Sequence, residues 1–145
     1  MMSITRNGRV IAISVLLAFS PLSFSEKASN VARAMFTTKI VDREPVDRVL
    51  VLNNKSSEIY FFTDLRHFEG QTITHKWLYD SNVQSVVNFK VKGPRWRVYS
   101  RKDIAPDKVG KWTVIIQDES GRSLKASVFL VAAEPDKQII LPQSN

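Results

Sequence analysis

The sequence predicts an all-β domain, most simply an antiparallel β-sandwich that is immunoglobulin-like in its general architecture. Three observations lead to this fold class. Turn-forming residues recur at short intervals, apolar and polar residues alternate with a period of two between them, and no helical period stands out beyond the N-terminal segment. About seven or eight short strands in one chain of 145 residues are typical of a sandwich and also fit a barrel.

The first four expected strands each end at turn-forming residues. Pro45 stops the first, because the residue before a proline is pushed into extended or turn geometry. Asn53–Asn54 stops the second, Gly70 follows the third, and a turn at 80–82 closes the fourth. These strands are expected at residues 34–41, 49–54, 57–65 and 72–80.

The remaining strands are expected to form two hairpins. Residues 83–92 are expected to pair with 95–102 across a two-residue turn at Gly93–Pro94. Residues 111–118 and 123–131 flank Glu119–Gly121, which suits a short hairpin turn. Trp96 alternates with Val98, and Trp112 with Val114 and Ile116, so both tryptophans are predicted to be buried structural residues.

The N-terminus has the features of a secretory signal peptide. Arg6 and Arg9 precede an apolar run that begins at Val10, and Ser23 and Ser25 are small residues at the positions that a signal peptidase reads. We therefore expect a signal peptide over residues 1–25 and a periplasmic or secreted protein. A retained anchor is the alternative, although the apolar run is shorter than the roughly 20 residues of a spanning helix. A linker at 26–32, the β domain at 33–131 and a tail or short edge strand at 132–145 would follow.

Charge and cysteine content limit the chemistry. The chain has no cysteine, which excludes a disulfide framework, zinc held by thiolates and a lipid-modified N-terminal cysteine. The net charge is +7 for the whole chain. Without residues 1–25 it would be +5, because Arg6 and Arg9 are the charged residues lost. A mildly basic exported domain suits an anionic surface but does not require one.

Several motifs together resemble a known family. They are DREPVD, IYFFTDL, THKWLYD, RWRVYS, GKWTVIIQDESGRSL and SVFLV, which span roughly Arg33 to Val131. In this order they resemble DUF2914, a bacterial family of unknown function. The departure is Arg101, where the family pattern has a second serine after Ser100. The resemblance implies a bacterial source, an envelope location and a small β domain, and it implies no catalytic residue.

One aromatic row is a first candidate site. Period two places Ile73, His75, Trp77 and Tyr79 on one face of a strand. His75, Trp77 and Tyr79 would suit a platform on which sugars stack. The same row suits a face packed on the second sheet, and we favour packing because aromatic side chains bury much apolar area.

A basic hairpin is the second candidate site. With a turn at Gly93–Pro94, Lys92 would face Arg95 and Lys90 would face Arg97, with Tyr99 following on the same face. Like charges opposite one another are destabilising, so this strip is either an anion-binding face or a charged edge that prevents strand pairing with other chains. The strip is predicted to be solvent-facing and the most positive surface of the domain, and edge protection is the favoured interpretation.

Enzymatic motifs are not evident. His67 and His75, with Asp64 and Glu69 nearby, lack the spacing of a metal site, and we expect no metal or cofactor. No nucleophile elbow or phosphate-binding glycine loop is present. We therefore expect an exported, non-enzymatic binding module for an envelope protein or an anionic envelope polymer. Recognition of an anionic glycan such as peptidoglycan or lipopolysaccharide is the alternative, and a hydrolase with unidentified residues is a third possibility. Export disfavours nucleic acid, and no membrane span is expected after signal cleavage.

Overall fold

The computed structural model describes residues 27–133 and 139–143, and these form eleven β-strands with no helix among them. The expected signal peptide at residues 1–25 lies outside the described residues. Within the described residues, no helix is long and apolar enough to span a membrane. The strands in chain order are β1 (Asn30–Thr37), β2 (Ile40–Val41), β3 (Glu44–Pro45), β4 (Asp47–Asn53), β5 (Glu58–Arg66), β6 (Thr72–Tyr79), β7 (Asn82–Lys90), β8 (Arg95–Asp103), β9 (Gly110–Gln117), β10 (Ser123–Ala132) and β11 (Ile139–Pro142).

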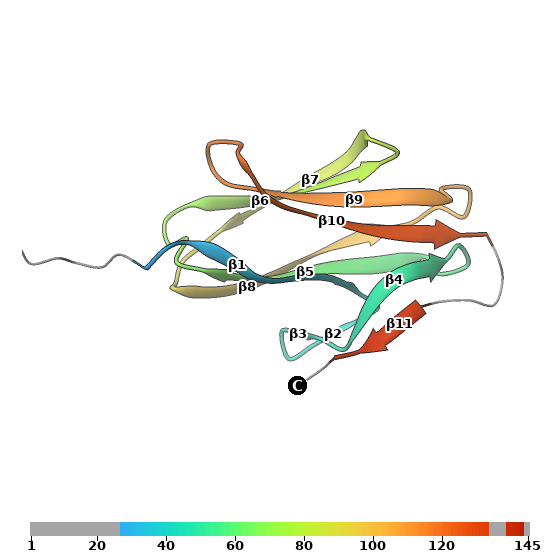
Figure 1. The fold of residues 1–145 in the computed structure, drawn as a ribbon, viewed down its shortest axis with the longest axis horizontal. Helices are drawn as coiled ribbons and strands as arrows, with labels where there is room; N and C mark the ends of the chain where they lie inside the picture. Colours follow the sequence, from blue (N-terminus) through green and yellow to red (C-terminus); the bar gives the residue numbers. More distant parts are fainter. Residues whose placement is uncertain (1–26, 134–138, 144–145) are drawn as a thin grey trace, which may run out of the picture.

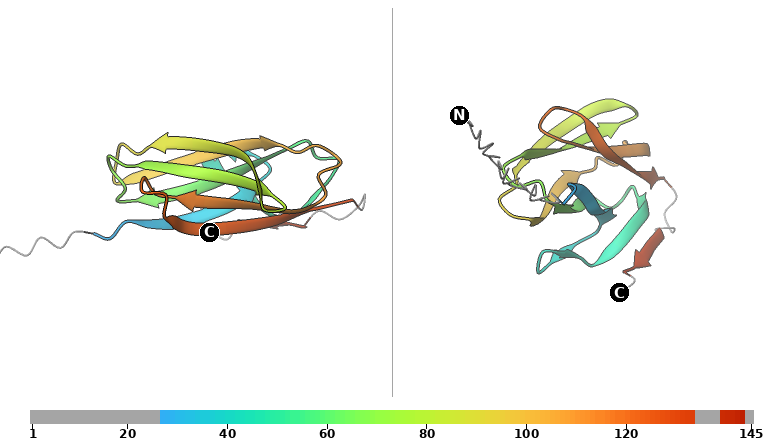
Figure 2. Two further views of the ribbon diagram at one scale, coloured as in Figure 1. Left: turned by 90° about the horizontal axis from the view of Figure 1, so that it is seen from above. Right: turned by 60° about the vertical axis from the view of Figure 1, so that its left-hand side comes forward.

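Two sheets pack face to face, as Figures 1 and 2 show. One sheet has the order β1-β5-β8, and the other has the order β11-β4-β10-β9-β6-β7. The predicted all-β sandwich is confirmed. Eight strands are seven residues or longer, which agrees with the predicted seven or eight, and the very short β2 and β3 and the four-residue β11 are additional. The pairing is antiparallel except for a short parallel contact between β4 and β10.

The hydrophobic core lies between the two sheets and is rich in aromatic rings. Phe36 of β1 is central, with ring centroids 4.7 Å from Phe61 and 4.5 Å from Phe129. Trp77 and Trp112 are fully buried in the same core, so the prediction for Trp112 is confirmed. Trp96 packs against the core but is only half-buried. The prediction that its side chain faces the core is confirmed, whereas the prediction that it is buried is only partly right.

Two hairpins turn through residues in the left-handed region. The β6–β7 hairpin has only Asp80 and Ser81 between its strands, with φ angles of 48° and 70°. The β2–β3 hairpin has Asp42 and Arg43 at 49° and 63°. Positive φ at both central residues is the signature of a type I′ turn, whose twist matches that of the flanking strands. The β2–β3 hairpin packs on the outer face of the three-stranded sheet, away from the core (Figure 1).

The predicted hairpin of residues 83–92 with 95–102 is wrong. β7 pairs with β6 in one sheet, and β8 pairs with β5 in the other, so the chain crosses between the sheets at this point. Gly93 does not have the positive φ that a Gly-first two-residue turn needs. The link is instead held to the segment between β5 and β6, where His67 N donates to Pro94 O at 2.9 Å and Val91 N to Gln71 O at 3.0 Å. Buried Val91 then closes this end of the core.

Candidate functional site

The aromatic row of β6 is part of the core. The predicted alternation of Ile73, His75, Trp77 and Tyr79 is confirmed, with the first three inaccessible to solvent. Tyr79 is half-buried, and its hydroxyl donates to Val109 O at 2.8 Å. His75 and Trp77 therefore cannot form a ligand platform, and the favoured packing interpretation holds.

His75 joins a buried polar network across the two sheets. Its Nε2 lies 3.1 Å from Thr63 Oγ1, and its Nδ1 lies 2.9 Å from Ser100 Oγ. Ser100 Oγ also accepts the indole N–H of Trp77 at 3.0 Å. A neutral ring protonated on Nε2 satisfies every group, because it donates to Thr63 and accepts the Ser100 proton. Burial lowers the pKa of His75 to about 3, so the ring stays neutral at physiological pH.

The histidines and carboxylates considered as a metal site face different parts of the molecule. His67 lies in the turn after β5 with a φ of 57°, whereas His75 faces the core. Asp64 faces away from the core and contacts arginines. Over residues 27–133 and 139–143, no group of three histidine or carboxylate side chains is close enough to hold a metal ion.

The predicted basic strip is divided between the two sheets. Lys90 ends β7, and its ammonium donates to Gly70 O at 2.9 Å, while Lys92 is exposed in the link that follows. Arg95, Arg97 and Tyr99 lie on β8 in the other sheet. The prediction of one strip on adjacent antiparallel strands is therefore wrong, and the lysines do not oppose the arginines.

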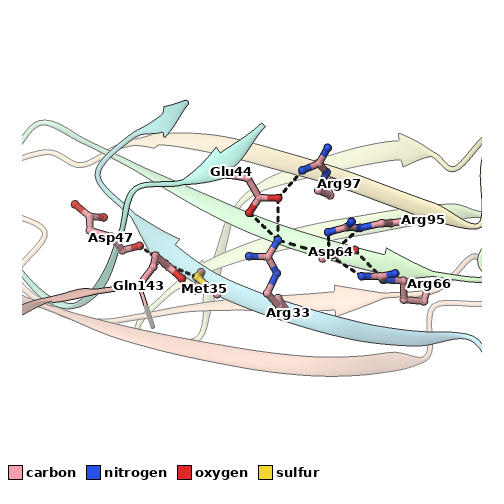
Figure 3. Close-up of polar contacts among 9 residues, drawn as sticks. All are labelled: Arg33, Met35, Glu44, Asp47, Asp64, Arg66, Arg95, Arg97 and Gln143. Carbon is pink, nitrogen blue, oxygen red and sulfur yellow. Dashed lines mark hydrogen bonds and ion pairs between the residues drawn. The ribbon is translucent and has the colours of Figure 1, made fainter. Parts of the chain in front are cut away.

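A larger group of arginines surrounds Asp64 on the outer face of the three-stranded sheet (Figure 3). The Asp64 side chain is only 1% exposed, although it points away from the core. Arg95 Nη2 lies 3.0 Å from its Oδ2, Arg66 Nε lies 3.1 Å from its Oδ1, and Arg33 Nη2 lies 3.6 Å from its Oδ2. A buried carboxylate needs such partners, because its desolvation is otherwise very costly.

Glu44 brings the β2–β3 hairpin to the same group. Its carboxylate accepts from Arg33 Nη2 at 2.7 Å and from Arg97 Nη1 at 2.5 Å. Partial burial acts to raise the pKa of Glu44, but hydrogen bonds from Arg97 and Arg33, with their charges, outweigh burial and hold this pKa below its usual value. Glu44 therefore remains ionised and links the hairpin to β1 and β8.

We call this group, with the neighbouring tyrosine, the arginine face. Its members are Arg33, Glu44, Asp64, Arg66, Arg95, Arg97 and Tyr99. Four guanidinium groups meet two carboxylates, so the face carries an excess of two positive charges. The four arginine side chains are between 29% and 49% exposed, which leaves guanidinium N–H groups open to solvent.

An aromatic border lies beside these charges. Tyr99 is 46% exposed, and its ring lies edge-on to Tyr60 with centroids 6.1 Å apart. Arg33 stacks over the ring of buried Phe62 at 4.9 Å. Guanidinium groups arranged beside aromatic rings suit planar anions, because arginine binds carboxylates and phosphates through paired N–H groups.

The family relationship rests on the strands that follow Glu69. A family described as "Protein of unknown function (DUF2914)" matches residues 70–131. Residues 70–131 are therefore similar to the DUF2914 family. The resemblance predicted from the sequence is confirmed over this range, while the motifs DREPVD and IYFFTDL precede it. No curated protein matches the chain.

The DUF2914 region contains only part of the arginine face. Arg95, Arg97 and Tyr99 lie inside it, whereas the two carboxylates and Arg33 and Arg66 come from the preceding strands. Sequence reasoning missed those four residues as a site. One signal was present, because Asp64 is an acidic residue within the mostly apolar run 59–65. The pairing of β8 with β5 that brings Arg95 and Arg97 to it is not local.

Proposed function

We propose that the protein is an exported, non-enzymatic binding module of the bacterial envelope and that the arginine face is its contact surface. The observation that carries the proposal is the excess of arginine over carboxylate on an open sheet face. Surplus guanidinium groups that are partly exposed attract and orient anionic groups.

A binding role is supported by where the reactive side chains lie. His75 and Ser100 are within hydrogen-bond distance, as in a nucleophile–base pair, but both are buried in the core, where substrate cannot reach them. The arginine face offers charge and hydrogen-bond donors, which are the properties of a recognition surface rather than of an acid–base site.

The ligand class that suits this face best is an anionic envelope polymer, with peptidoglycan and lipopolysaccharide as the two candidates. Both carry carboxylate or phosphate groups that guanidinium forks recognise. Tyr99 beside Arg97 adds an exposed ring, which suits a sugar or another planar group next to the anion. A protein partner with an acidic patch is the other member of this functional class.

The test measures co-sedimentation of the mature chain with purified peptidoglycan and with lipopolysaccharide vesicles. The variant Arg95→Gln/Arg97→Gln removes the two surplus charges and leaves Asp64 beside Arg66 and Glu44 beside Arg33. The matched control is Lys90→Gln/Lys92→Gln, which removes the same charge from the other sheet and the link. We expect the arginine variant to bind one polymer at least about tenfold more weakly, and the lysine variant to bind like the parent.

Salt gives an independent measurement on the parent protein. Binding should weaken between about 0.1 M and 1 M salt, because the Debye length falls from about 10 Å to about 3 Å. Failure of the parent to bind either polymer, or equal binding by the arginine variant, would contradict the proposal. The lysine variant should melt like the parent. The arginine variant keeps Arg33 and Arg66 beside Asp64, so it should lose some stability but remain folded at the assay temperature, and its melting curve separates loss of binding from loss of fold.

A further inference from the structure

Each of the two sheets has two edge strands, and one of these four edges lacks the usual protection against pairing with another chain. The edges are β1 and β8 in the smaller sheet, and β11 and β7 in the larger one. An edge strand presents unpaired backbone N–H and C=O groups, which proteins shield with charge, proline, short length or a covering segment.

Three of the edges carry such protection. β8 has Arg95, Arg97 and Arg101 along its length, and charged side chains on an edge discourage pairing with other strands. β11 has only four residues and ends in Pro142. β1 lies against β4 and β10 of the other sheet.

The fourth edge, β7, is different in composition. Its nine residues are NVQSVVNFK, with no proline and with no charge before the final Lys90. Its one irregularity is the bulge between Val83 and Ser85, so Ser85–Lys90 runs regularly along β6. Val83 and Val86 are 51% and 53% exposed. Among the described residues, no strand besides β6 pairs with β7.

We propose that β7 pairs antiparallel with β7 of a second copy of this chain, so that two six-stranded sheets join across a two-fold axis. An antiparallel pair places opposite residues on the same face, so the axis passes through a residue rather than between two. With the axis at Val87, Val86 faces Asn88 of the partner and Lys90 faces Gln84. With the axis at Val86, Ser85 faces Val87 and Lys90 faces Asn82. In neither register does a charge oppose a like charge.

A second copy is a better occupant than a strand of another protein because of charge. The isolated domain is basic, so another protein attracted to it by charge would carry acidic side chains. The β7 edge has no basic residues before Lys90 with which acidic side chains could pair, so it does not favour such a partner. Two copies of this uncharged strand pair without placing like charges opposite one another. The arginine face lies on the other sheet, so this pairing leaves it open and the two proposals are independent.

Cysteine cross-linking tests the pairing directly, because the chain contains no cysteine of its own. Single variants Ser85→Cys, Val86→Cys, Val87→Cys and Asn88→Cys are oxidised at several protein concentrations, with Val128→Cys as the control. Val128 is 49% exposed on β10, a strand that is not at an edge. We expect the residue on the two-fold axis to form disulfide-linked dimers fastest, since its Cα atoms lie about 4.5–5.5 Å apart.

Lysine substitutions test the same interface without covalent cross-linking. Val86→Lys/Asn88→Lys puts like charges opposite one another in the Val87 register, and Val128→Lys is the control. Sedimentation equilibrium should show a concentration-dependent dimer for the parent and the control, and about tenfold weaker association for the β7 variant. A parent that stays monomeric, or cysteine variants that cross-link no faster than Val128→Cys, would overturn the proposal. Cross-linking to a different envelope protein instead of a second copy would also overturn it.

Discussion

At the scale of single residues, two buried polar side chains in the smaller and larger sheets meet the cost of burial differently. Asp64 has three arginines within ion-pair distance on the outer face of the sheet, and these offset the desolvation of its carboxyl group. His75 instead gives up its charge and is satisfied by two hydroxyl groups in the core. A charge is tolerated only where partners of opposite sign are available, and the core side of β6 offers none.

The depressed pKa of His75 predicts a loss of stability in mild acid. The pKa of His75 is about 3 in the folded protein, compared with an ordinary value of 6.5. Below pH 6.5 the unfolded chain binds a proton that the folded protein excludes, so stability falls as pH drops from 6.5 towards 3. Between pH 7 and pH 5 this residue should cost about 2 kcal/mol of unfolding free energy.

Urea denaturation at pH 7 and pH 5 measures this effect. His75→Gln should be less stable than the parent at pH 7 but should lose less stability on acidification. His67→Asn is the matched control, since it removes the other histidine from a turn with positive φ and should leave the parent's pH dependence intact. A His75→Gln variant with the full acid loss would contradict the assignment.

At the scale of elements, the turns decide where each strand ends, and tertiary contacts decide which strands meet. The β6–β7 hairpin follows its local sequence, because two residues in the left-handed region suffice to reverse the chain. The link from β7 to β8 does not form a hairpin, because burial of Val91 and hydrogen bonds to the β5–β6 segment hold it across the end of the sandwich.

The β6–β7 turn allows a stabilising exchange. Neither Asp80 nor Ser81 is the residue best suited to positive φ, and Asn-Gly is the preferred pair for a type I′ turn. Asp80→Asn/Ser81→Gly should raise the unfolding free energy by roughly 1 kcal/mol, because left-handed geometry costs ordinary residues about 1–2 kcal/mol. A lower midpoint in urea would refute this assignment of the turn.

Gly121 provides the opposite control in the β9–β10 turn. Its φ is +84°, and an added Cβ would meet no atom within 4 Å, so Gly121→Ala tests backbone strain without a steric clash. Its unfolding free energy should fall by about 1 kcal/mol. Neither Asp80→Asn/Ser81→Gly nor Gly121→Ala is expected to change core packing, so their unfolding free energies report the effect of turn geometry.

At the scale of the whole molecule, the first strand limits where a signal peptide can be cut. β1 begins at Asn30 and pairs with β5 from that residue onward. Cleavage after Ala34 would remove more than half of β1 and the Arg33 that contacts Glu44 and Asp64. A site after Ser25 leaves the strand and the arginine face complete.

Export is therefore predicted to yield a chain that begins at Glu26. N-terminal sequencing of the protein from a periplasmic fraction measures the site. Ser23→Leu/Ser25→Leu should block cleavage, because the peptidase reads small residues there, whereas Ser14→Leu within the apolar run should not. A full-length chain that stays with membranes after carbonate washing would mean a retained anchor instead.

The sequence by itself determined the fold class, the placement of most strands and the inward-facing side of β6, β8 and β9. Alternation in β6 predicted which of its residues enter the core, and it did so because side chains of neighbouring residues point to opposite faces in any extended strand. The turn at 80–82 and the hairpin turn at 119–121 were equally predictable, because both depend on a few adjacent residues.

Only the tertiary structure decided which charges meet. Arg95 and Arg97 were predicted to oppose Lys92 and Lys90, yet β8 pairs with β5 and finds Asp64 there, while Glu44 reaches Arg97 from a hairpin more than fifty positions earlier in the chain. Strand pairing depends on residues far apart in the chain, because it must bury the apolar faces of whole strands. Arg66 and Arg95 lie directly opposite each other in this pairing, and Asp64 between them offsets their like charges. Local alternation of apolar and polar residues determines which face of the sheet a side chain occupies. Which other side chains it meets on that face depends on the pairing of whole strands.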